Sequence, residues 1–243
     1  MFLFMRPKLV LDVFTYDELL LTTAPIESSM KHTPKWWKGL KRDRTTESVP
    51  TRNTKDCPAI REYFMGAITI PMWSDMLITI NEDKSYAWNF SNHNCAATVH
   101  PDDQVGGFFA ASQLGHLKLE SPWLIHCKES VKWLWSPPIY GSTVLADVRM
   151  FPGVSQFDQS CGAHIQLGLN LSSPKSFMIP FGEPIAHLFP LSEREVVIKR
   201  HLITKEEYTS RARPTNVTFN NTYHIVKEKK ELFAGCPYSK HES

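Results

Sequence analysis

One pair of residues in the chain has the spacing of a metal site. His100 and Asp102 form an H-x-D pair, which can supply two of the three ligands of an Fe(II) centre built from two histidines and one carboxylate. The candidates for the third ligand are His116, His126, His164 and His187. The alternative interpretation is a turn, because two aspartates follow Pro101. Since one H-x-D match is unsurprising among ten histidines, the sequence predicts neither a metal nor another cofactor.

A second group of residues has the composition of a binding surface. The segment from Lys31 to Arg42 places two adjacent tryptophans, Trp36 and Trp37, among basic residues that include Lys38. Lys and Arg contact phosphates and Trp stacks on bases, so nucleic acid is one possible partner. Tryptophan and Arg are also the usual anchors of protein interfaces. We interpret the segment as a protein contact, with Trp36, Trp37, Lys38 and Arg42 as the partner-binding residues, and keep nucleic acid as the alternative.

The charge distribution sets this segment apart from the rest of the chain. The net charge of +2 divides into −2 over residues 1–30, +6 over 31–61, −6 over 62–193 and +4 over 194–243. Basic segments therefore flank an acidic centre. No apolar run approaches the roughly 20 residues of a membrane-spanning helix, and no signal-peptide cleavage pattern follows the apolar start. We expect a protein that is made inside the cell and does not bind a membrane.

Other sequence motifs of catalysis are absent. The five cysteines include no C-x-x-C pair, so they predict reduced thiols and neither a disulfide framework nor a zinc site. The sequence contains no G-x-x-x-x-G-K, G-x-G-x-x-G or G-x-S-x-G motif. P-loop hydrolysis, dinucleotide redox chemistry and esterase chemistry of the nucleophile-elbow type therefore lack support.

The elements that must position these residues are expected to be mainly strands. The 243 residues are 42% hydrophobic, and 17 prolines against 11 glycines favour many short elements. Strands are predicted at residues 9–14, 67–70, 72–80, 86–90, 117–119, 123–127, 131–135, 142–150, 164–171, 177–179, 185–189 and 195–203. Short helices are predicted at residues 55–66, from residue 204 onward and at residues 223–232. A turn or a short helix is predicted at residues 17–20. Short strands at this frequency favour a sandwich or a jelly-roll-like barrel over a βαβ fold.

The same patterns divide the chain into four segments. Residues 1–21 form an N-terminal strand that joins the core, and residues 22–54 form a basic, aromatic arm. Residues 55–193 form the β core, and residues 194–243 form a polar C-terminal extension. Long polar segments of this kind usually bind something.

Two stretches of the core, within residues 121–191, resemble the dUTPase and dCTP deaminase superfamily. Phe151–Asp158 (FPGVSQFD) is similar to the superfamily's hairpin motif, and Ile179–Pro190 (IPFGEPIAHLFP) is similar to the motif that ends its barrel. The resemblance implies a β-clip fold, here with a few short helices and long basic arms. It also implies a ligand pocket around Gly153, Gln156 and Asp158, with Gly153 at the tip of a hairpin.

The chain departs from this superfamily at the positions that perform its chemistry. Gln156 stands where the resemblance places a catalytic Asp, and an amide cannot accept a proton from water. Ile139 and Tyr140 replace the Arg-Ser pair that holds phosphate, and the Gly-rich C-terminal lid is reduced to Gly235. Asp158 is interpreted as a turn residue. We therefore predict no catalytic residue and favour a protein that is not an enzyme.

Most of residues 30–195 is also similar to an uncharacterised family of proteins found in tailed phages, notably cyanophages, and in some bacteria. The similarity rests on Pro34-x-Trp36-Trp37, Cys57-Pro58, Ile70-Pro71-x-Trp73-x-Asp75, His100-x-x-x-Gln104 and Ser121-Pro122-Trp123. It implies a structural component of the virion, such as a head decoration, neck or tail accessory subunit, made in the host cytoplasm.

Such a subunit would bind neighbouring phage structural proteins through its arm and its C-terminal extension. It would also form a homo-oligomer, and the analogy with β-clip proteins suggests a trimer. Two other functions stay open: a nucleotide-binding or nucleotide-hydrolysing enzyme of the dUTPase and deaminase type, and a jelly-roll Fe(II) oxygenase.

Overall fold

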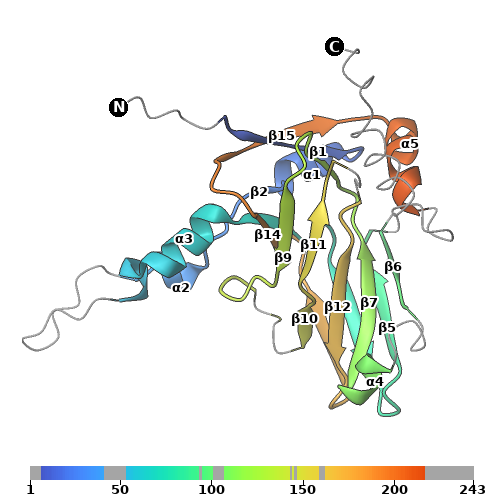
Figure 1. Cartoon of the computed structure of the whole chain (residues 1–243). Helices are drawn as coiled ribbons and strands as arrows, with labels where there is room; N and C mark the ends of the chain where they lie inside the picture. Colours follow the sequence, from blue (N-terminus) through green and yellow to red (C-terminus); the bar gives the residue numbers. More distant parts are fainter. Residues whose placement is uncertain are drawn as a thin grey trace, which may run out of the picture.

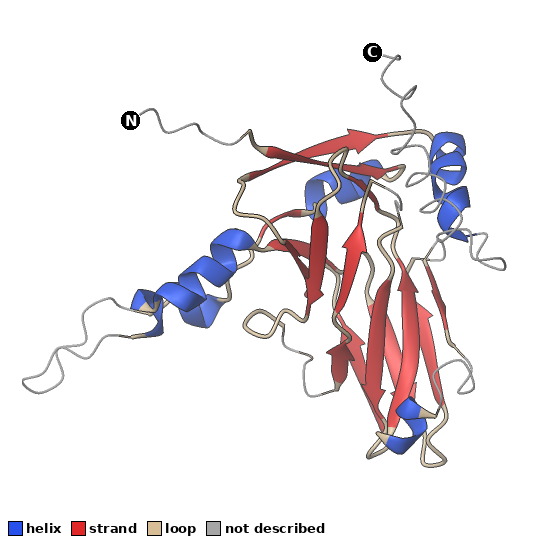
Figure 2. Ribbon diagram, in the orientation of Figure 1, coloured by secondary structure: helices blue, strands red, loops and turns tan. Residues whose placement is uncertain are grey.

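The structure is a computed structural model that describes residues 7–40, 53–92, 95–100, 107–142, 144, 147–158 and 162–216. The fold is mainly β, as predicted (Figure 2). The strands are β1 (Leu9–Thr15), β2 (Glu27–Ser28), β3 (Ile68–Pro71), β4 (Met76–Ile80), β5 (Tyr86–Phe90), β6 (Ala96–Thr98), β7 (Leu114–Glu120), β8 (Leu124–His126), β9 (Lys132–Ser136), β10 (Val148–Met150), β11 (Gly153–Gln156), β12 (Ile165–Asn170), β13 (Lys175–Ile179), β14 (Pro184–Pro190) and β15 (Val196–Leu202). The helices are α1 (Glu18–Thr23), α2 (Lys35–Lys38), α3 (Pro58–Gly66), α4 (Phe108–Ala111) and α5 (Lys205–Asn216), with a 3₁₀ turn η1 (Thr54–Asp56).

The strands form four open sheets, whose orders are β15-β1-β8, β10-β12-β7-β6, β11-β9-β14-β3-β2 and β13-β4-β5. Most neighbouring strands are antiparallel, but β1 and β15 pair in parallel over their whole length, from Leu9 opposite Val196 to Thr15 opposite Leu202. Two interior strands of the five-stranded sheet, β3 and β14, are almost entirely buried. Their near-continuous apolar sequence is what burial on both faces requires.

One continuous core holds most of these sheets together. It includes the fully buried side chains of Trp123 and Trp133, and alternate residues of β1 and β4 point into it. Alternation of this kind places every second side chain of a strand on one face, which is why the period-2 pattern predicted these strands correctly.

The start of the C-terminal extension belongs to the folded body. β15 completes a sheet with β1, and α5 lies at one end of that sheet (Figure 1). Ala212 of α5 packs against Phe14 and Leu124 on the sheet. Arg194, just before β15, binds the carboxylate of Glu129 and donates hydrogen bonds to the carbonyls of Pro7 and Lys8. The first part of the predicted C-terminal extension therefore packs on the core through β15 and α5.

Several elements differ from the sequence prediction. β10 covers residues 148–150 of the strand predicted at 142–150, of which residues 143, 145 and 146 lie outside the described residues, and α2, β2, β6, β11 and α4 were not predicted. α3 begins at Pro58 with Cys57 at its N-cap, so Asp56 does not cap it as expected and lies in η1. The helix predicted at 223–232 lies outside the described residues. No helix in the described part of the chain is long and apolar enough to cross a bilayer.

Candidate interaction surface

The two adjacent tryptophans have different environments. Both lie on α2, and because successive helical residues point in different directions, one can face the protein while the other faces solvent. Trp37 is 8% exposed and packs against Phe64 of α3, with 5.3 Å between ring centroids. Trp36 is 49% exposed. Only Trp36 is therefore available to a partner, and the prediction that Trp37 contacts a partner directly is corrected to an internal contact.

The exposed indole of Trp36 is held in place. Its Nε1–H donates a hydrogen bond to the backbone carbonyl of Tyr140, at 3.2 Å. Tyr140 in turn packs edge-on against Tyr63 of α3, with 5.2 Å between centroids. The adjacent side chain, Ile139, is 59% exposed. We call Trp36, Ile139 and Tyr140 the Trp36 surface: a fixed, largely apolar patch beside the exposed Lys35 and Lys38.

Lys55 of η1 binds the end of α2 and so attaches the arm to the segment that precedes α3. Its ammonium donates hydrogen bonds to the carbonyls of Lys38, at 3.0 Å, and Leu40, at 3.2 Å, at the end of α2. A cation at this position also interacts favourably with the negative end of the helix dipole. The same ammonium lies 5.6 Å from the centroid of the Trp37 ring. The described part of the arm is therefore attached to the body, while Arg42 lies outside the described residues.

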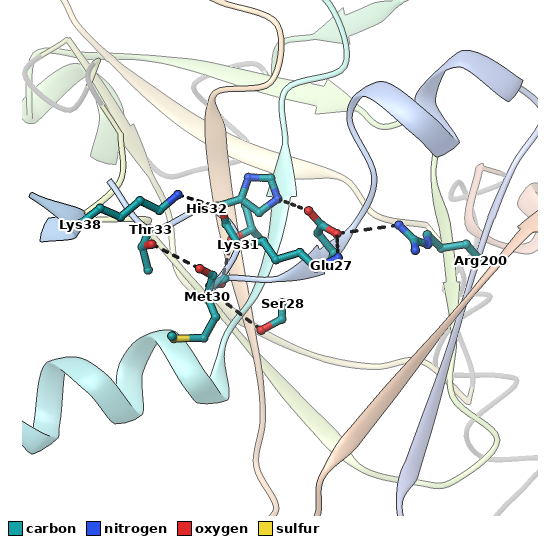
Figure 3. Close-up of polar contacts among 10 residues, drawn as sticks. Glu27, Ser28, Met30, Lys31, His32, Thr33, Lys38 and Arg200 are labelled. Carbon is teal, nitrogen blue, oxygen red and sulfur yellow. Dashed lines mark hydrogen bonds and ion pairs between the residues drawn. The ribbon is translucent and has the colours of Figure 1, made fainter. Parts of the chain in front are cut away.

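A charged cluster around Glu27 positions the turn that leads into α2 (Figure 3). The Glu27 carboxylate, whose side chain is 18% exposed, lies 2.6 Å from Lys31 Nζ, 3.3 Å from His32 Nε2 and 3.9 Å from Arg200 Nη1. Burial lowers the pKa of His32, although the carboxylate of Glu27 partly opposes this. Sequence analysis missed this cluster because Arg200 is distant in the chain and Lys31 and His32 appeared to belong to a free arm.

A buried pair of residues, His187 and Tyr63, lies behind the Trp36 surface, where Tyr63 contacts Tyr140. His187 on β14 is 1% exposed, and its Nδ1 lies 2.8 Å from the hydroxyl oxygen of Tyr63. The Tyr63 hydroxyl donates to the carbonyl of Pro137 at 3.1 Å, so its oxygen accepts from the Nδ1–H of His187. Burial lowers the pKa of His187 to about 4 and raises that of Tyr63 to about 12. Both groups are neutral near pH 7, and the pair acts as a structural anchor for α3.

Gly153, Gln156 and Asp158 do not surround a hairpin tip. Gly153 begins β11 and pairs with Trp135 of β9, and no heavy atom lies within 4 Å of the position that a Cβ would occupy. The Gln156 amide donates to the hydroxyl of Ser130 at 3.2 Å. Asp158 follows β11, and its charge adds to the effect of burial in raising the pKa of the Cys127 thiol. Gly153 is therefore the first residue of a strand and not the tip of a hairpin as expected, although its backbone is exposed.

The residues of the alternative iron site are only partly brought together. The His100 backbone N–H donates to Nδ1 of His116 at 3.0 Å, and Nε2 of His116 lies 2.7 Å from Oε1 of Gln166. Both nitrogens of His116 are thus already hydrogen-bonded, and Asp102 lies outside the described residues. Within the described ranges, no group of three or more His, Cys, Asp or Glu side chains could hold a metal ion. The described cysteines, Cys57, Cys95 and Cys127, are free thiols.

Comparison with known proteins adds no relative. No protein-family model matches this chain. No curated protein and no solved structure is significantly similar to it.

Proposed function

We propose that the chain is a non-enzymatic assembly protein, a structural subunit of a tailed-phage particle that binds neighbouring subunits through the Trp36 surface. The observation that carries this proposal is the state of Trp36, which is half exposed and yet anchored to the Tyr140 carbonyl. A tryptophan that is already ordered loses little conformational entropy when a partner covers it. Residues of this type dominate the binding energy of protein interfaces.

The surroundings of Trp36 indicate what the partner surface would offer. Ile139 extends the apolar area, and the ammonium groups of Lys35 and Lys38 lie on the same short helix. A complementary surface would combine an apolar recess for the indole with carboxylates around it. Nucleic acid is a weaker fit, because the two tryptophans do not form a pair of exposed stacking surfaces.

The first partner that we propose is another copy of this chain. β11 is an outer strand of the five-stranded sheet, and its Val154 side chain is 57% exposed. Unpaired strand edges favour association with another chain. A β-clip or jelly-roll-like arrangement of the sheets, a trimeric assembly and a location in the virion are part of the same proposal and rest on the resemblances in the sequence.

The two enzymatic alternatives have less support. The nucleotide-enzyme alternative would use Gly153, Gln156 and Asp158, where the general base is replaced by an amide that is already bonded to Ser130. The oxygenase alternative would need His116, whose ring nitrogens are both hydrogen-bonded. Neither hypothesis has a specific contact in its favour.

Sedimentation velocity of the full chain tests the proposal. We expect an oligomer that dissociates when Trp36→Ala removes the indole, while circular dichroism stays that of the folded chain. Leu19→Ala is the matched control, because Leu19 is a 62% exposed apolar residue on α1 that makes no part of the Trp36 surface. A wild-type monomer at all concentrations, or equal sedimentation of Trp36→Ala and wild type, would contradict the proposed self-association. Turnover of dUTP or dCTP by the purified chain would favour the enzymatic alternative instead.

A further inference from the structure

A cleft of about 160 Å³ is lined by residues of α5, of the segment after β1, of the end of β7 and of the loop before β4. Tyr16, which follows β1, lines one side of it, and Tyr208 of α5 lines another. Trp73, from the loop between β3 and β4, and Glu120, at the end of β7, also line it. A cavity of about 150 Å³ can hold a molecule as large as benzene. The cleft is therefore large enough for a small organic group.

The two tyrosines form a rigid aromatic corner. Their ring centroids are 4.9 Å apart, and the ring planes meet at 76°. The Tyr208 hydroxyl donates to the Ser121 carbonyl at 2.9 Å, which fixes the orientation of that ring. Lys205 Nζ lies 5.9 Å from the centroid of Tyr16 and is not among the residues that line the cleft, so the Tyr16 ring already attracts a cation from outside it.

The cleft has one carboxylate in its lining. Glu120 lines it together with His164, and none of the described lining residues is Lys or Arg. Burial raises the pKa of Tyr208, and the nearby Tyr16 and Glu120 raise it further. Burial likewise raises the pKa of Tyr16, and Cys95 and Asp17 add to the effect. Both tyrosines are therefore neutral near pH 7, and Glu120 is the lining group whose charge would attract a cation.

Trp73 lines the cleft next to Cys95. Its side chain is 2% exposed, and its indole N–H is directed at the sulfur of Cys95, where it opposes the larger effect of burial on the pKa of that thiol. The Cys95 thiol beside it is not a nucleophile, because burial raises its pKa and keeps it protonated near neutral pH.

These features select one class of ligand. A phosphate or nucleotide would meet Glu120 with no described Lys or Arg to balance its charge. A neutral apolar molecule would bury the Glu120 carboxylate without a counter-charge. Aromatic rings with a nearby carboxylate are the usual site for alkylated ammonium groups. We propose that this cleft binds a methylated ammonium group, with Tyr16, Tyr208 and Trp73 as its aromatic walls and Glu120 as its counter-charge.

Calorimetric titration with choline and with its uncharged isostere 3,3-dimethylbutan-1-ol tests the charge requirement. We expect choline to bind and to raise the melting temperature of the full chain in a concentration-dependent way. The isostere has the same shape without the charge and should bind at least about five-fold more weakly. A third titration, with an acetylated trimethyl-lysine, distinguishes a free small molecule from a modified side chain as the source of the group. Equal binding of choline and the isostere, or no binding of any of the three compounds, would overturn the proposal.

Variants locate the site. Glu120→Gln and Tyr16→Leu should each weaken choline binding by roughly ten-fold, whereas Tyr16→Phe, which keeps the ring, should bind like wild type. Glu195→Gln is the matched carboxylate control, because Glu195 pairs with Lys8 at the opposite end of the β1–β15 sheet. If Tyr16→Leu does not fold, Glu120→Gln against Glu195→Gln still decides the question. Unchanged affinity in Glu120→Gln would overturn the proposal. This cleft is separate from the Trp36 surface, so neither result bears on the proposed assembly function.

Discussion

The indole N–H of Trp36 donates to the backbone carbonyl of Tyr140, although 104 residues separate them in the chain. This bond joins α2 to the loop after β9 and gives an exposed aromatic ring a single orientation. Its neighbour Trp37 packs inward on Phe64. The same dipeptide thus provides one anchor for the protein's own fold and one half-exposed ring, which the proposed function assigns to a partner.

The two tryptophans should respond differently to truncation. Trp37→Ala empties a buried site against Phe64 and is expected to cost about 3–5 kcal/mol of unfolding free energy. Trp36→Ala removes a half-exposed ring and one hydrogen bond, so its cost should stay near 1 kcal/mol. Urea unfolding followed by circular dichroism measures both values. A larger loss for Trp36→Ala than for Trp37→Ala would show that their roles have been assigned the wrong way round.

His187 should make stability depend on pH. Its pKa is about 4 in the folded chain, against about 6.5 when unfolded. As the pH falls, the unfolded chain therefore binds a proton at this residue before the folded chain does. The unfolding free energy falls as the pH drops from about 6.5 to about 4, and His187 causes no pH dependence above that range. The difference in pKa corresponds to about 3 kcal/mol.

The variant His187→Gln isolates this effect, because its side-chain amide can still donate to the Tyr63 oxygen. Urea unfolding of wild type and variant at several pH values should show that the unfolding free energy of the variant falls less steeply toward acid pH. His32 and His116, whose pKa values burial also lowers, act in the same direction in both proteins. If the unfolding free energies of the two proteins depend on pH in the same way below about pH 6.5, His187 is not the buried neutral group described above.

Two glycine substitutions test the corrected position of Gly153. A Cβ at Gly168 would lie 2.6 Å from Cζ of Phe151, so Gly168→Ala must displace that ring and should cost about 1–3 kcal/mol. Gly153→Ala should cost less than about 1 kcal/mol, because nothing lies within 4 Å of its Cβ position. Thermal unfolding compares the two. If Gly153→Ala proves the more damaging, the strand position assigned to Gly153 is incorrect.

Arg194 should control how firmly β1 and β15 stay paired. Its guanidinium contacts Glu129 and the carbonyls of Pro7 and Lys8, at the start of the parallel pair. Arg194→Ala is expected to speed amide hydrogen exchange in both strands, and Lys199→Ala, on the same sheet, serves as the control. If Arg194→Ala leaves amide exchange unchanged, Arg194 does not stabilise the pairing of β1 and β15.

The sequence predicted the elements whose pattern is local. Alternating apolar residues located β1, β4 and β5, and Pro58 located the start of α3 to within a few residues. β11 was missed because its four residues alternate too little, and Gly153 was interpreted through a resemblance instead of through strand pairing.

The sequence could not predict which tryptophan would be buried. Trp36 and Trp37 are chemically identical, and their separation depends on Tyr140 and Phe64, which only the folded chain brings near. The same reason hides the Glu27 cluster, whose partner Arg200 lies on β15, and the aromatic cleft, which draws Tyr16 and Tyr208 from opposite ends of the chain.

Quantitative mass spectrometry of purified particles tests the assembly role most directly. The proposed function predicts that particles made with the wild-type chain contain it at a constant copy number, and that particles made with Trp36→Ala lose it although the variant is folded and present in the lysate. Wild-type particles that lack the chain, or Trp36→Ala particles that retain it at the wild-type copy number, would contradict that role.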